Sequence, residues 1–246
     1  MRLYDEIIHD ILTSLEKQDK HILPVGAAAD PVSRDWQDAG KAMMILQSDM
    51  AYELGGHNLP AVGNTLVTTG KDFVPEDEII LIGKDLPEIT EDTPYARIAL
   101  VRVAEDSIGK GDRLYNTIRN IGYFRYHIYP KGFMLRVSSS NDRESVRVEA
   151  EALNEGLNFT AIGNAMLRAL HLHKEVEAVR IIFITDPKVD YGRLQDGLKK
   201  TKQITATIDH MLKDVNMDCG SCGLQEICDE IEGLREMHFG MSEEHT

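Results

Sequence analysis

Three cysteines near the C-terminal end of the chain have the spacing most suited to chemistry. Cys219, Cys222 and Cys228 are all the cysteines of the 246-residue sequence, and they lie within ten positions. A Cys-x-x-Cys pair followed by a third cysteine brings three thiolates within reach of one iron–sulfur cluster or one zinc ion. Such centres usually take four ligands, so the sequence leaves the fourth ligand open.

The candidates for this fourth ligand are His238, His210, a partner molecule, or a position left open. Apolar residues at 3- and 4-residue spacing predict a helix over 224–238. On an unbroken helix Cys228 and His238 would lie about 15 Å apart, so they share a metal only if the helix breaks at Gly233. Two alternatives need no metal: reduced structural thiols, with Cys228 packed as a small apolar residue, or a redox disulfide.

A second candidate site is a stretch in which basic and aromatic residues alternate. Its members are Arg113, Tyr115, Arg119, Tyr123, Phe124, Arg125, Tyr126, Tyr129 and Lys131. Guanidinium groups bind phosphates and aromatic rings stack on adenine, so the stretch could hold an anionic, nucleotide-like ligand such as coenzyme A. The alternative is a set of surface arginines beside core tyrosines.

Other polar residues carry weaker signals. Gly55 to Asn58 reads as a turn, His171 and His173 as a capping and surface pair, and Asp186 as either a functional group or a turn residue before Pro187. No Ser–His–Asp arrangement or paired carboxylate motif can be identified, so hydrolase chemistry has no support.

Composition restricts the classes of partner. Hydrophobic content of 42% and charged content of 28% are typical of a soluble globular protein. The net charge of -14 argues against a nucleic-acid partner, because phosphate binding needs a concentrated basic surface. The sequence shows no signal peptide and no apolar run of 18 residues, so we expect a cytoplasmic protein that does not enter a membrane.

Hydrophobic periodicity predicts a mixed α/β (α+β) fold, with a central mixed sheet flanked by helices. Helices are expected over 2–18, 36–47, 107–124, 159–173 and 188–214, and a loop over 21–35. Strands are expected over 51–56, 64–70, 78–83, 96–104, 133–139, 145–150 and 176–186. The predicted organisation is a helical N-terminal extension (1–48), an α/β domain (49–215) and a small cysteine-bearing helical segment (216–246). The apolar stripe of the first helix packs either on the core or on a partner subunit.

The order of motifs between about residues 49 and 222 resembles the middle, coenzyme-A-handling domain of acetyl-CoA synthase, the β subunit of the carbon monoxide dehydrogenase/acetyl-CoA synthase complex. The matching pieces are DMAYELGG with NLP after it, IILIGKDLPEI, LYNTIRNIGYFR, KGF and IIFITDPKV, followed by a polar helix and CGSC. Residues 1–48 have no counterpart in that family.

The resemblance implies that the cysteines hold a 4Fe–4S cluster. Cys219 and Cys222 match the family's first two ligands, and Cys228 is a candidate third at a shorter spacing. No cysteine occupies the fourth position, near which His238 falls. Zinc is the alternative metal.

The resemblance also implies a coenzyme A site. Tyr115 stands at about the position of a family tryptophan that is associated with coenzyme A, and Arg119 and Arg125 match arginines of the family pattern. The family's nickel-binding Cys-Gly-Cys belongs to a later domain, so no nickel site is expected in this chain.

These observations predict an iron–sulfur-binding, acetyl-CoA-synthase-like protein that acts as a subunit or accessory factor in anaerobic one-carbon (CO/acetyl-CoA) metabolism. Its expected partner is a protein such as carbon monoxide dehydrogenase or a corrinoid protein, or a second copy of itself. The alternative is a non-catalytic, zinc-binding or metal-carrying assembly module. Whether the chain is an enzyme stays open.

Overall fold

A computed structural model describes residues 3–26, 44–105, 112–126, 130–138 and 143–213; within these ranges the side chains of 112–114, 125–126 and 210–213 are not described. The helices and strands are, in chain order, α1 (Asp5–Ser14), β1 (His21–Leu23), β2 (Met50–Leu54), β3 (Ala61–Thr68), β4 (Glu78–Ile82), the 3-10 helix η1 (Leu86–Glu88), β5 (Tyr95–Val103), α2 (Asp112–Gly122), the 3-10 helix η3 (Tyr123–Tyr126), β6 (Phe133–Ser138), β7 (Arg143–Glu149), α3 (Ala150–Asn154), α4 (Phe159–Leu170), β8 (Val176–Ile184) and α5 (Tyr191–Lys213).

A five-stranded mixed sheet forms the centre of the molecule, in the order β1-β4-β8-β5-β3. β8 runs parallel to β4 and antiparallel to β5, while β3 is parallel to β5 and β1 is antiparallel to β4. The inner strands are almost entirely buried, as continuous apolar runs such as that of β5 require. The predicted mixed α/β fold is therefore confirmed, including the interior position of the strand at 96–104.

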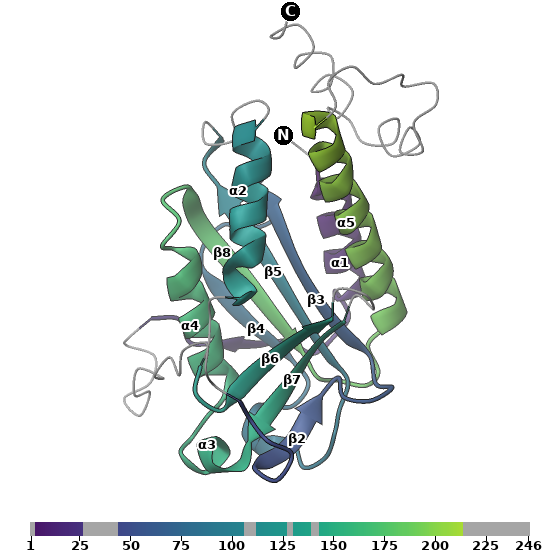
Figure 1. Cartoon of the computed structure of the whole chain (residues 1–246). Coiled ribbons are helices and arrows are strands. Elements are labelled where there is room, and N and C mark those ends of the chain that lie inside the picture. The colour runs from purple at the N-terminus through teal and green to yellow at the C-terminus, as the bar shows by residue number, and fades with distance from the viewer. Residues whose placement is uncertain (1–2, 27–43, 106–111, 127–129, 139–142, 214–246) are drawn as a thin grey trace, which may run out of the picture.

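Helices cover this sheet and line its β3 edge (Figure 1). α4 packs on β4 and β8, α2 packs on β3, and α1 packs against α5 beside the same strand. The Asn158 side chain accepts a hydrogen bond from the Ala161 amide, as expected for a residue that begins α4. In α1 the buried residues are Ile7, Ile8 and Ile11, so its apolar stripe packs on the core of its own chain.

A smaller antiparallel sheet, in the order β2-β7-β6, crosses the β3 end of the large sheet (Figure 1). Arg97 of β5 and Glu144 of β7 join the two sheets through a bidentate ion pair, with Nε–Oε1 at 2.6 Å and Nη2–Oε2 at 2.7 Å. The two side chains are 0% and 1% exposed. A Cβ at Gly63 would collide with the Glu144 carboxyl group, so β3 needs glycine where this side chain crosses it.

The structure corrects several local predictions. Residues 21–23, predicted as loop, form β1, because Ile22 pairs with Ile80 at the sheet edge. Arg143 and Glu144, predicted as turn, belong to β7. α3 was not predicted. Residues 107–111 of the helix predicted over 107–124 lie outside the described residues, and α2 is described from Asp112. The helix predicted over 36–47 lies mostly outside the described residues, and its described end at 44–46 is not helical.

Candidate functional site

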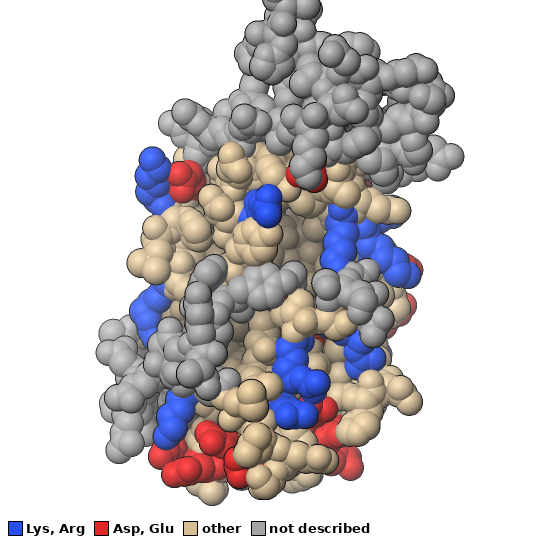
Figure 2. All heavy atoms as spheres, in the orientation of Figure 1, with Lys and Arg blue, Asp and Glu red and all other residues tan. Residues whose placement is uncertain are grey.

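A cleft of about 360 Å³ lies between α2 and α5, at the outer edge of β3. α2 and α5 form its two walls, and Gly63, Asn64 and Thr65 of β3 form its floor (Figure 1). In the space-filling view Lys and Arg side chains lie over α5 and also around the small sheet, where most of the visible Asp and Glu side chains gather (Figure 2). Among the residues that line the cleft, Arg119 and Lys202 are cationic and Asp209 is anionic, on a chain whose net charge is -14.

The α2 side of the cleft contains three residues of the basic–aromatic stretch identified from sequence. Tyr115 and Arg119 are one helical turn apart, and Tyr123 follows after another turn, so the three share one face. The Arg119 guanidinium carbon lies 5.8 Å from the centre of the Tyr115 ring and 5.3 Å from that of Tyr123. Its Nε donates to the Tyr123 hydroxyl at 3.0 Å. This hydrogen bond, together with the attraction of both tyrosines, raises the pKa of Arg119, which therefore stays charged.

Arg125, the third predicted coenzyme A residue, lies in η3 directly after this wall, but its side chain is outside the described residues. The opposite wall is built from one face of α5. Thr201, Lys202, Thr205 and Asp209 of this face line the cleft. The sequence pattern identified this helix only as long and polar. The cation on this wall, Lys202, was missed.

The floor is polar and rests on the buried ion pair. Asn64 is 2% exposed, and its Nδ2 donates to Thr201 Oγ1 at 3.1 Å. Arg97 Nη1 donates to Thr65 Oγ1 at 3.3 Å and to the Asn64 carbonyl at 3.5 Å. Burial by itself lowers the pKa of Arg97, but the charge and hydrogen bonds of Glu144 more than offset this, so the net shift is upward. Sequence analysis read this stretch only as a strand; a polar Asn64 within it was the signal available.

The cleft therefore combines a stacked arginine, a lysine on the facing wall and a floor of hydrogen-bonding groups. Arginine forks and lysine ammonium groups bind phosphates, and tyrosine rings offer faces to a flat base. This arrangement suits a ligand that has both anionic groups and an aromatic ring.

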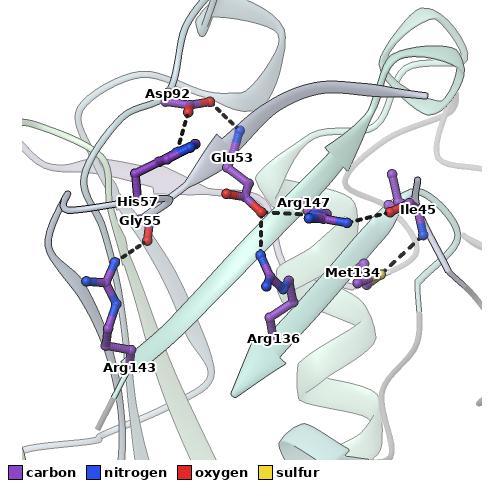
Figure 3. Close-up of polar contacts among 9 residues, drawn as sticks. All are labelled: Ile45, Glu53, Gly55, His57, Asp92, Met134, Arg136, Arg143 and Arg147. Atoms are coloured by element: carbon purple, nitrogen blue, oxygen red, sulfur yellow. Dashed lines mark hydrogen bonds and ion pairs between the residues drawn. The ribbon is translucent and has the colours of Figure 1, made fainter. Parts of the chain in front are cut away.

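A second polar cluster lies on the outer face of the small sheet (Figure 3). Arg136 Nη1 and Arg147 Nε both donate to Glu53 Oε1, and Arg147 Nη1 donates to the Ile45 carbonyl at 3.0 Å. Burial tends to raise the pKa of Glu53, but the two arginines outweigh it and hold the pKa below its usual range. Arg143 caps the loop after β2 by donating to the Gly55 and Leu59 carbonyls. All these contacts tie β2 and its loop to β6 and β7.

Three weaker candidates have structural roles. The Asp186 carboxylate accepts a hydrogen bond from the Lys188 amide, which makes it a turn residue. His171 pairs with Asp77 at 2.8 Å at the end of α4. Gly55, with φ of 65°, and His57, with φ of 49°, form the turn after β2.

The predicted metal ligands Cys219, Cys222, Cys228 and His238 lie outside the described residues. α5 is described to Lys213, and Cys219 follows six positions later in the sequence. Within the described ranges, no three His, Cys, Asp or Glu residues are grouped so that they could hold a metal ion. No helix of that part of the chain is long and apolar enough to cross a membrane.

Comparison with known families gives a match. The model of the family described as CO dehydrogenase/acetyl-CoA synthase complex beta subunit matches residues 37–189, which are 153 of the 246 residues. No curated protein matches the sequence. The matched range includes β3 and α2, and therefore the floor and one wall of the cleft; it ends just before α5.

Proposed function

This chain belongs to the CO dehydrogenase/acetyl-CoA synthase complex beta subunit family, and we propose that it serves one-carbon (CO/acetyl-CoA) metabolism by binding coenzyme A in the α2–α5 cleft. Its role is that of an acetyl-CoA-synthase-like subunit or accessory factor, working with a protein partner such as carbon monoxide dehydrogenase or a corrinoid protein.

The observation that carries this proposal is the placement of Arg119 between two tyrosine rings in the wall of a cleft. Coenzyme A has an adenine ring, a diphosphate and a 3′-phosphate. Tyr115 and Tyr123 offer ring faces for the adenine, while Arg119 and Lys202 supply positive charge from opposite walls. Arg125 is the third proposed contact, on the basis of its position in the family pattern.

Substitution of Arg119 tests this assignment. Arg119→Ala should weaken coenzyme A binding about tenfold or more in isothermal titration, because it removes charge-assisted hydrogen bonds to phosphate. Lys199→Ala is the matched control, since Lys199 is an exposed cation of α5 that pairs with Asp196 and does not line the cleft. Wild-type protein with no measurable affinity for coenzyme A would refute the proposal.

The second part of the proposal is a 4Fe–4S cluster held by Cys219, Cys222 and Cys228, with His238 as the candidate fourth ligand. Thiolates and imidazole are the donors that such clusters take, and a bound cluster would supply electron transfer. Anaerobically purified protein should contain about four iron and four sulfide per chain, and Cys222→Ser should lose them. Unchanged metal content in that variant would exclude these cysteines as ligands.

The presence of three cysteines rather than four favours one alternative, a zinc-binding or metal-carrying assembly module without catalysis. The same measurement separates the two proposals. Colourless protein that contains zinc and no sulfide would support the alternative, whereas absorbance near about 400 nm with acid-labile sulfide would support the cluster.

A further inference from the structure

The hydrogen-bonding direction of the cleft floor can be worked out from its neighbours, beginning with Asn64. Thr201 has one hydroxyl proton, which it donates to the Gly197 carbonyl at 2.9 Å. Its oxygen must therefore accept from Asn64, which fixes Nδ2 on the side of α5. Asn64 Oδ1 is left with no hydrogen-bond partner in the part of the chain that the structure describes, although the residue is only 2% exposed. The floor thus offers one fixed acceptor.

Thr65 adds a hydroxyl that can donate to a ligand. An arginine only donates, so the contact between Arg97 Nη1 and Thr65 Oγ1 uses a lone pair of the threonine. The hydroxyl proton stays available, and none of the described residues accepts it. Arg97 cannot turn away, because Glu144 holds its Nε and Nη2 in the interior. Thr65 can therefore donate this proton to a ligand.

The polarity of Thr65 contrasts with that of another threonine in the same cleft. Thr205 Oγ1 donates to the Thr201 carbonyl at 2.9 Å and contacts the Tyr4 hydroxyl at 3.0 Å, so its proton and a lone pair are used within the protein. Of Thr65, Thr201 and Thr205, Thr65 on the floor is thus the one whose hydroxyl proton is not used by a described residue.

We propose that Asn64 and Thr65 form a subsite for an amide group of the ligand, in which Thr65 donates to the amide carbonyl and Asn64 Oδ1 accepts from the amide N–H. Successive side chains of a strand point to opposite faces, and β3 is the outer strand, so the two groups flank its edge. The C=O and N–H of a trans amide also point in opposite directions, which lets one amide lie along that edge and reach both.

This inference rests on the proposed coenzyme A site, because the pantetheine arm of coenzyme A carries two such amides. The arm would lie on the floor while the adenosine phosphates lie between Arg119 and Lys202. The subsite would then select ligands with an amide-bearing arm over the nucleotide portion alone, and it would orient the thiol end of the arm.

Two ligands and four proteins test the subsite by isothermal titration. Adenosine 3′,5′-bisphosphate has the adenine and two phosphates but no pantetheine arm. Thr65→Val should weaken coenzyme A binding about fivefold to tenfold, the value of one hydrogen bond, and leave bisphosphate binding unchanged. Thr65→Ser, which keeps the hydroxyl, should bind both ligands like the wild type. Thr13→Val, at an exposed threonine of α1 that does not line the cleft, is the matched control and should also change neither affinity.

The possible failures are distinguishable. A wild type that binds neither ligand overturns the proposed function itself. A wild type that binds coenzyme A, with Thr65→Val unaffected, overturns only the amide subsite. If Thr65→Val weakened the binding of both ligands equally, the adenine rather than the pantetheine arm would lie on the floor. That result would also overturn the amide subsite. Thr65→Ala provides a second variant with the same expected outcome if the valine variant does not fold.

Discussion

Two of the arginine–glutamate centres in the molecule, one between the sheets and one on the small sheet, differ in burial. Arg97 and Glu144 lie between the two sheets with 0% and 1% of their side chains exposed. Arg136 and Arg147, which share Glu53 on the outer face of the small sheet, are 45% and 25% exposed. The chemistry is the same, but water can replace a lost partner only at the outer centre. The inner pair therefore fixes how the sheets meet, while the outer cluster only strengthens the pairing of strands already held by backbone bonds.

The largest expected effect comes from breaking the inner pair. Glu144→Gln leaves the Arg97 charge buried without a counter-ion, which should cost about 3–5 kcal/mol of unfolding free energy in urea titration. The double variant Arg97→Met with Glu144→Leu removes both charges and should restore most of the loss. A loss of no more than about 2 kcal/mol in Glu144→Gln would show that the inner pair resembles the outer one.

An intermediate effect is expected at the outer cluster. Glu53→Gln should cost about 1–2 kcal/mol at pH 7, because the freed arginines regain water at their exposed sides. The arginines hold the pKa of Glu53 below its unfolded value, so its contribution is complete above that value and is lost as pH falls through the folded pKa. The stability difference between wild type and Glu53→Gln should therefore shrink below about pH 4. A difference that grows on acidification would contradict this sign.

The smallest effect is expected where both partners face water. Lys199 and Asp196 on α5 are 59% and 72% exposed at 3.2 Å. Asp196→Asn should change the unfolding free energy by less than about 0.5 kcal/mol, and this small change should vanish in high salt. Thermal and urea unfolding at low and high ionic strength would measure this change. A larger loss would mean that burial does not determine how much an ion pair contributes to stability.

The same two centres show how far the sequence could be read. The apolar run of β5 correctly predicted an interior strand, because a continuously apolar strand is typically buried on both faces of a sheet. The partner of Arg97 could not be predicted, since Glu144 lies 47 positions away in a polar stretch that resembles a turn. Periodicity reports which face of an element is buried, but it does not report which distant residue compensates a buried charge.

The cleft also contains residues that the sequence pattern identified and residues that it did not. Tyr115 and Arg119 could be predicted because their types and spacing lie within one helix. Asn64, Thr65 and Lys202 come from β3 and α5, and only the packing of these elements around the sheet edge brings them beside α2. The ligand roles of Tyr115, Arg119, Arg125, the three cysteines and His238 stay predictions.

The position of β8 in the sheet has a consequence for synthesis of the protein. This strand lies between β4 and β5, yet it is the last strand of the described residues to leave the ribosome. From residue 103, where β5 ends, to residue 184, where β8 ends, translation takes roughly 4 to 16 s at bacterial to eukaryotic rates. During that time the nascent chain carries two apolar strands with the central place between them unfilled. Newly made chains should therefore depend on chaperones until β8 has been added.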